Sequence, residues 1–194
     1  MKQGFVKVAS ATPRIRVADP VYNAQVICEQ AKEAAEHGAK IVVFPELCIT
    51  GYTCNDLFLQ ELLLEKAKEA LLTIAEETGQ LETLFLVGLP VDKDGRLYNV
   101  AAVLYRGRIL GMIPKKNIPM YAEFYEGRHF TPGEETVTEY RLGKQVIPFG
   151  SNLLFRCEEL PELILGCELC EDLWVAEPPS TSHALMGATV IANL

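Results

Sequence analysis

Three polar side chains, Glu46, Lys115 and Cys170, each follow an apolar run that the sequence predicts to be a β-strand. The three runs comprise residues 41–44, 108–112 and 163–169. In α/β folds the ligand cleft lies beyond the carboxyl ends of the strands. We therefore treat the three side chains as candidates for one functional site.

Together, a carboxylate, an ammonium and a thiol are sufficient to hydrolyse an amide through a thioester. A carboxylate beside a thiol can take its proton and so activate the sulfur as a nucleophile. An ammonium group and backbone N–H groups stabilise the negative charge that develops on the carbonyl oxygen. The same carboxylate can return the proton to the departing amine, so no histidine is required. Each residue taken singly is more often a surface or core residue, and spacing alone does not show that the three meet.

The cysteines also allow a metal site. Cys167 and Cys170 form a C-x-x-C pair, and Cys48 and Cys54 could supply two further ligands. Zinc sites of this kind place the pair on a turn, usually with a second pair or with histidines. Here the pair lies in or beside a predicted strand, and the spacing of Cys48 and Cys54 is not that of a zinc knuckle. Zinc is the poorer hypothesis, and we expect no metal ligand.

A cysteine–histidine pairing is a second alternative for Cys170. His37, His129 and His183 are scattered along the chain, and none of them lies in a motif that supports such a pairing. We expect His37 to lie at the end of a helix and the other two to be surface or loop residues. No glycine-rich phosphate loop is present either, so no nucleotide site is expected.

Composition narrows the class of protein. The 194 residues suit one domain, or one domain and part of another. The net charge is −8 and the longest basic cluster is Lys115-Lys116, which argues against a nucleic-acid partner. No stretch approaches the roughly 20 apolar residues of a membrane span, and the first residues do not resemble a secretory signal. We expect a cytoplasmic protein with free thiols.

Strands alternate with amphipathic helices, which indicates an α/β layered fold. Asp19 is expected to cap a helix that begins at Pro20 and ends at Gly38, and a second helix is expected from near Asp56 to Gly79. The predicted strands cover residues 6–10, 41–44, 84–88, 101–105, 108–112, 163–169 and 188–192. The pair around Arg106-Gly107 is expected to be a hairpin. Because the last strand is followed only by Asn193-Leu194, we expect a fragment of a longer domain, incomplete at its C-terminus.

The same three segments resemble the nitrilase, or carbon–nitrogen hydrolase, superfamily. Residues 44–52 (Phe-Pro-Glu-Leu-x-x-x-Gly-Tyr) resemble its glutamate motif, Lys115 ahead of Ile118-Pro119 resembles its lysine motif, and Cys170 falls at its nucleophile. A narrower resemblance is to the glutaminase domains of glutamine-dependent NAD synthetases, carried by residues 114–133 and by Cys-Glu-Asp-Leu-Trp at 170–174. The resemblance covers nearly the whole chain.

This resemblance implies an α-β-β-α sandwich of which residues 1–194 form the N-terminal part. It implies Glu46 as general base, Lys115 as oxyanion support and Cys170 as nucleophile, with Tyr121 and Glu171 holding the glutamine. The ammonia would serve the ATP-dependent amidation of deamido-NAD to NAD by a C-terminal synthetase domain, absent from this chain. The resemblance further implies a homo-oligomer. No cofactor is expected in this chain, since ATP and Mg belong to the synthetase domain.

Two other functions stay open at this point. One is a stand-alone amidase or carbamoylase of the same superfamily. The other, from a different class, is a non-catalytic assembly or regulatory module that keeps only the fold. Preference for glutamine over simple aliphatic amides distinguishes the first from a glutaminase, and reaction of Cys170 with electrophilic glutamine mimics argues against the second.

Overall fold

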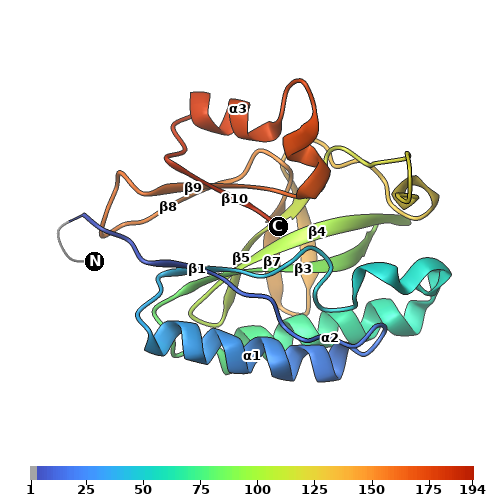
Figure 1. Cartoon of the computed structure of the whole chain (residues 1–194), viewed down its shortest axis with the longest axis horizontal. Coiled ribbons are helices and arrows are strands. Elements are labelled where there is room, and N and C mark those ends of the chain that lie inside the picture. The colour runs from blue at the N-terminus through green and yellow to red at the C-terminus, as the bar shows by residue number, and fades with distance from the viewer. Residues whose placement is uncertain (1–3) are drawn as a thin grey trace.

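In the computed structural model, residues 4–194 form two β-sheets that pack face to face between helices (Figure 1). In chain order the elements are β1 (Val8–Ser10), α1 (Pro20–Glu36), β2 (Ile41–Val43), α2 (Glu61–Glu77), β3 (Leu84–Lys93), β4 (Arg96–Tyr105), β5 (Arg108–Pro114), β6 (Thr138–Leu142), β7 (Gln145–Phe149), β8 (Leu154–Arg156), β9 (Ile164–Glu168), α3 (Pro179–Leu185) and β10 (Val190–Asn193). Short 3₁₀ helices cover Tyr52–Leu59, Glu126–Arg128 and Cys170–Trp174. The order is β1-β2-β3-β4-β5-β7-β6 in the larger sheet and β10-β9-β8 in the smaller one.

Figure 1 shows α1 and α2 on the outer face of the larger sheet and α3 over the smaller sheet. The layers are therefore those of an α-β-β-α sandwich, and the expected fold class is confirmed. Within the described part of the chain, no helix combines the length and the apolar character needed to cross a lipid bilayer.

Two of the apolar cores, one on each face of the larger sheet, explain why the central strands are apolar on both faces. In β3, Phe85, Val87 and Leu89 pack against the helical layer, whereas Leu86 packs between the sheets. Successive side chains of a strand point to opposite faces, so a strand covered on both sides must be apolar throughout. This burial fixes the direction of the strands and hence the positions of the residues that follow them.

The first helix agrees with its prediction. The Asp19 carboxylate accepts a hydrogen bond of 3.1 Å from the Tyr22 N–H, and Pro20 occupies the first turn, where a missing N–H does no harm. The chain leaves the helix through Gly38, whose φ of +82° is the left-handed conformation that glycine adopts without strain.

The predicted start of the second helix is wrong. Residues 52–59 form a 3₁₀ segment with a break at Asn55, and α2 begins only after the extended residue Gln60. Asp56 caps nothing, because its carboxylate binds Arg128 at 2.7 and 2.9 Å and His129 at 3.1 Å. A distant ion-pair partner has thus taken the side chain that the local pattern assigned to a cap.

The hairpin of β4 and β5 is confirmed, with Arg106 and Gly107 both at positive φ as a two-residue turn of this type requires. The strands β6, β7 and β8 and the helix α3 were not predicted. His183 was expected at the surface or in a loop; that is wrong, because it is fully buried in α3 and its Nε2 lies 2.9 Å from the Ser151 carbonyl oxygen.

Glu46 owes its position to a close backbone contact between the loop that follows β2 and strand β3. A Cβ atom added to Gly88 would lie 2.3 Å from the Leu47 nitrogen and 2.8 Å from the Glu46 carbonyl carbon. The Ile49 N–H then donates to the Gly88 carbonyl oxygen at 3.1 Å. Only glycine permits this approach, which carries the loop and Glu46 across the end of the sheet.

We expect Gly88→Ala to lower the free energy of unfolding by about 1–3 kcal/mol, because the clashing atoms are backbone and cannot rotate away. Urea unfolding followed by circular dichroism measures the change. Gly111→Ala is the matched control, since its added Cβ would meet side-chain atoms of Leu153 and Phe155 at 2.9 Å, which can move. A loss for Gly88→Ala no larger than that for the control would contradict the proposed constraint.

Candidate active site

A buried ion cluster lies beyond the ends of the central strands. The Lys115 ammonium is 2.7 Å from Glu46 Oε1 and 2.7 Å from Glu126 Oε1. Exposure of the three side chains is 0% for Lys115, 11% for Glu46 and 4% for Glu126. Two of the three residues predicted from the sequence are therefore in direct contact, joined by a second glutamate that the prediction did not include.

Different parts of the fold bring these groups together. Lys115 follows β5, where its N–H donates to the Asn99 carbonyl oxygen at 2.8 Å and its own carbonyl oxygen accepts from Gly133 N–H at 2.7 Å. Glu46 lies beyond the C-terminal end of β2, and Glu126 begins a 3₁₀ helix in the loop after β5. The contacts join residues 69 and 11 positions apart, so only the completed fold creates the cluster.

Two neutral side chains complete the hydrogen bonds of the carboxylates. The Asn99 amide donates to Glu46 Oε1 at 2.7 Å and to Glu126 Oε2 at 3.3 Å. The Tyr52 hydroxyl donates to Glu126 Oε1 at 2.9 Å. Since Lys115 and Asn99 both bind Oε1 of Glu46, the second oxygen of that carboxylate stays available to another group.

The electrostatics of the cluster follow from burial and from its unequal charges. Burial raises the pKa of Glu46, with Glu126 adding to the rise and Lys115 opposing it. Burial disfavours the Lys115 ammonium, but the two carboxylates outweigh it and raise the pKa of Lys115 above its ordinary value. Lys115 is thus held as a cation, while the proton affinity of Glu46 is greater than that of an exposed glutamate.

Cys170 stands at the edge of this cluster. It is the first residue of the 3₁₀ helix after β9, is half-buried, and has a φ of +40°. Its N–H donates to the Leu194 carbonyl oxygen at 2.8 Å. Burial raises the pKa of the Cys170 thiol. The negative charge of Glu46 also raises it, and the positive charge of Lys115 lowers it. Glu46 and Lys115 are thus in direct contact, and Cys170 lies near enough for its thiol to respond to both of their charges.

The two residues predicted to bind substrate also meet. The Tyr121 hydroxyl donates to Glu171 Oε2 at 2.8 Å; Tyr121 is exposed to solvent and Glu171 is half-buried. Glu171 follows Cys170 directly in the sequence, so this pair lies beside the candidate nucleophile. The binding role of the two residues remains a prediction.

Glu126, Asn99 and Tyr52 are the residues that the sequence analysis missed as members of the site. A usable signal existed for Asn99, a polar residue inside the otherwise apolar run of β4, where an unpaired amide would be costly. Tyr52 and Glu126 lie within the two motif segments, but only the fold shows that their side chains turn towards Lys115.

The zinc and histidine alternatives find no support in the geometry. Cys48, Cys54 and Cys167 belong to three separate apolar cores. Among residues 4–194, no three histidine, cysteine, aspartate or glutamate side chains are grouped as metal ligands. His129 binds Asp56, and His183 faces the Ser151 carbonyl oxygen. Neither histidine therefore forms a pair with Cys170.

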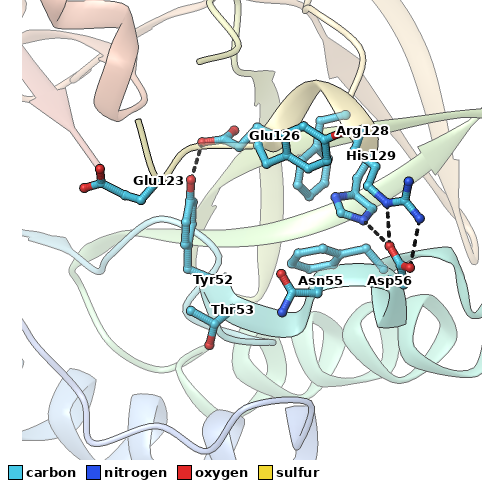
Figure 2. A pocket seen from close by; sticks show the side chains of 11 residues that line it. Tyr52, Thr53, Asn55, Asp56, Glu123, Glu126, Arg128 and His129 are labelled. Atoms are coloured by element: carbon cyan, nitrogen blue, oxygen red, sulfur yellow. Dashed lines mark hydrogen bonds and ion pairs between the residues drawn. The ribbon is translucent and has the colours of Figure 1, made fainter. Parts of the chain in front are cut away.

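A pocket of about 370 Å³ adjoins the cluster (Figure 2). Tyr52 and Glu126 belong both to its wall and to the ion cluster, and Figure 2 shows their hydrogen bond. On the other side of the pocket Asp56 binds Arg128 and His129. A second cavity of about 670 Å³ lies near the opposite ends of β2 and β3, beside Lys40 and Leu84, away from the cluster.

Comparison with known proteins identifies a family. The profile of the family described as carbon-nitrogen hydrolase matches residues 7–194. The glutamine-dependent NAD(+) synthetase of Mycobacterium tuberculosis (strain ATCC 25618 / H37Rv) is 42% identical over 193 residues, which are 100% of this chain and 28% of that protein. The same enzyme of Thermotoga maritima is 33% identical over 195 residues, covering 100% of this chain and 30% of that protein. The chain thus spans less than a third of the length of these relatives.

Solved structures agree with the fold. A glutamine-dependent NAD(+) synthetase from Cytophaga hutchinsonii superposes with a TM-score of 0.85 at 28% identity, over 97% of this chain and 30% of that chain. An amidase from Nesterenkonia sp. has a TM-score of 0.71 at 22% identity, over 97% of this chain and 64% of that chain. The second likeness supports the architecture only.

We expect Lys115→Met to lower the free energy of unfolding by about 3–5 kcal/mol, because it leaves two carboxylates buried without a cation. Lys115 opposes the rise that burial causes in the pKa of Glu46, so without it that pKa lies further above its value in the unfolded chain. Stability is then retained at low pH and lost as pH rises. Urea unfolding at about pH 5 and about pH 8 measures this, with the larger loss expected at the higher pH.

Lys32→Met serves as the control for removing a lysine. Lys32 pairs with Glu77 at 2.7 Å, but the two side chains are 46% and 54% exposed. Its replacement is expected to cost less than about 1 kcal/mol at either pH. Equal losses for the two variants would show that the buried cluster contributes nothing special to stability.

Proposed function

The chain belongs to the carbon–nitrogen hydrolase family, and from that premise we propose that it hydrolyses the side-chain amide of glutamine through a thioester on Cys170. The observation that carries the proposal is the buried contact between the Glu46 carboxylate and the Lys115 ammonium, whose charges act on the half-buried Cys170 thiol. The substrate is supported by the relatives whose name includes glutamine dependence, of which this chain covers 28–30%.

The first half of the reaction forms the thioester. Glu46 takes the thiol proton through the oxygen that Lys115 and Asn99 leave free, and the sulfur attacks the amide carbon. The carbon–nitrogen bond then breaks, and Glu46 returns the proton to nitrogen, which leaves as ammonia. The raised pKa of Glu46 suits both steps, because the group must accept a proton and then release it.

The second half returns the enzyme to its starting state. Glu46 takes a proton from water, and the water oxygen attacks the thioester carbon. The carbon–sulfur bond breaks, glutamate is released, and the sulfur recovers its proton from Glu46. All atoms of the amide and the water are accounted for in glutamate and ammonia.

Oxyanion stabilisation falls to Lys115 and to a backbone N–H group. An ammonium has three N–H donors, and two of those of Lys115 bind Glu46 and Glu126, which leaves one for the carbonyl oxygen. In the described part of the chain the Glu171 N–H has no backbone acceptor, and it follows the sulfur directly in sequence. Glu126 keeps Lys115 charged and oriented, so its role is to position the lysine.

For the amino-acid end of glutamine we propose Glu171 and Tyr121. The Glu171 carboxylate can bind the α-ammonium group, and the Tyr121 hydroxyl, which donates to Glu171, fixes the direction of that carboxylate. This pairing would distinguish glutamine from amides that lack a charged end.

The ammonia is proposed to serve an ATP-dependent synthetase domain that amidates deamido-NAD to NAD, with ATP and Mg bound there. Support comes from the names and the greater length of the relatives. Assembly into a homo-oligomer and a cytoplasmic location stay predictions.

Substrate preference tests the proposal. We expect kcat/KM for glutamine to exceed that for propionamide by at least about tenfold, because only glutamine offers a group to Glu171. Ammonia release measures both. Cys170→Ala and Glu46→Gln should each lower turnover about 10³-fold or more, since one removes the nucleophile and the other removes the base. Circular dichroism should show both variants folded. Preference for the simple amide would favour a stand-alone amidase, and full activity in either variant would contradict its assigned role.

We also expect the acidic limb of the pH–activity profile to lie above the ordinary glutamate pKa of 4.5. Activity requires ionised Glu46 and is lost as pH falls through its raised pKa. Glu126→Gln removes a charge that contributes to this rise, so the limb should move to lower pH, whatever the loss in maximal rate. The exposed Glu139→Gln is the control and should leave the limb in place. A limb unmoved by Glu126→Gln would exclude Glu46 as the titrating group.

A further inference from the structure

Asp172 is a buried carboxylate that the reaction scheme does not use. It lies two residues after Cys170 in the same 3₁₀ helix, and its exposure is 1%. No lysine or arginine in the described part of the chain forms an ion pair with it. Burial raises the pKa of Asp172, and hydrogen bonds from the backbone oppose that rise. A buried charge without a cation is costly, so its partners must account for its presence.

The partners of Asp172 come from two separate segments. One oxygen, Oδ2, accepts from the Leu169 N–H at 3.1 Å, beside the nucleophile. The other, Oδ1, accepts from the Asn117 N–H at 2.7 Å, the Asn117 side-chain amide at 2.9 Å and the Lys116 N–H at 3.2 Å. The carboxylate therefore joins the turn that carries Cys170 to the loop that follows Lys115.

Each of these segments would be poorly fixed without such a link. Cys170 has a φ of +40°, a conformation that costs a residue with a Cβ atom free energy and persists only when the surroundings enforce it. Lys116 and Asn117 lie outside β5, where no strand pairing holds their N–H groups. Capping of its own helix explains only the bond to Leu169, whereas the bonds to Lys116 and Asn117 span 56 and 55 positions of sequence.

We propose that Asp172 is a positioning residue that sets the placement of the Cys170 sulfur relative to the Lys115 ammonium. This inference rests on the proposed function. The sulfur must attack the carbon whose oxygen Lys115 stabilises, so the two groups must reach the same carbonyl at once. Small displacements between reacting groups lower the rate strongly, while substrate affinity depends on other contacts. Loss of Asp172 should therefore reduce kcat more than it changes KM.

Asp172→Asn keeps the shape of the side chain but turns one acceptor into a donor. Whichever way the amide rotates, that donor faces either the Leu169 N–H or the N–H groups of residues 116 and 117. We expect kcat for glutamine to fall at least about tenfold, with KM changed less than about threefold.

Asn117→Asp perturbs the same link from the other side. It sets a second carboxylate against Asp172, and like charges at a buried contact repel, so kcat should again fall by about tenfold. In the double variant the new amide at 172 can donate to the new carboxylate at 117. We expect the double variant to recover at least about threefold in kcat over Asn117→Asp alone, a coupling that independent effects cannot produce.

The experiment measures kcat and KM for these three variants of the 194-residue chain beside the wild type. Thr83→Val is the stability control, because it removes a buried hydrogen bond of 2.8 Å to the Ala39 carbonyl oxygen near the opposite ends of β2 and β3. It should lower the free energy of unfolding and leave kcat unchanged.

The outcomes separate this inference from the function on which it rests. Wild-type chain that releases no ammonia in a Cys170-dependent way overturns the proposed function. Wild-type turnover with normal kcat in both single variants, or a double variant slower than either one, overturns the positioning role of Asp172 alone. A fall in kcat with recovery in the double variant supports it.

Discussion

A lysine ammonium buried between two glutamates is the interaction on which the rest of the site depends. Lys115 is fully buried, and a charge removed from water is tolerated only where carboxylates and hydrogen bonds surround it. Meeting that condition takes the loop after β2, the hairpin of β4 and β5 and the 3₁₀ turn at Glu126. Any rearrangement that separates these parts leaves a buried charge without a partner. The interactions that stabilise buried Lys115 are therefore the same ones that assemble the site.

The apolar cores on the two faces of the larger sheet make this arrangement rigid. The strand β3 packs towards the helices with one face and towards the smaller sheet with the other, so it cannot slide without exposing side chains on both sides. Gly88 then lets the loop carrying Glu46 lie directly against that strand. On the second sheet, β9 delivers Cys170 to the same end of the sandwich. The polar residues thus lie at the ends of strands whose registers are fixed by packing.

The sequence predicted those parts of the fold and the site that depend on neighbouring residues. Local signals were sufficient where a residue acts on its near neighbours: Asp19 on Tyr22, Arg106-Gly107 in a tight turn, and apolar runs that become buried strands. They failed where a distant partner decides the outcome, as when Arg128 binds Asp56 and so removes it from a helix cap. For the same reason Glu126 and Asn99 were not predicted as members of the site. Their role depends on partners that are distant in the sequence and come close only in the folded chain. His183 was misplaced because a short helix against β9 leaves little periodic pattern to detect.

The left-handed backbone at Cys170 means that the residue needed for activity lowers the stability of the fold. A residue with a Cβ atom held at φ of +40° stores strain of about 1–2 kcal/mol, and glycine would relieve it without the thiol. Laboratory evolution that selects only for heat tolerance would therefore favour replacement of Cys170 by glycine. The selected proteins would be more stable but inactive. A screen for hardier forms of this chain has to retain a functional selection throughout.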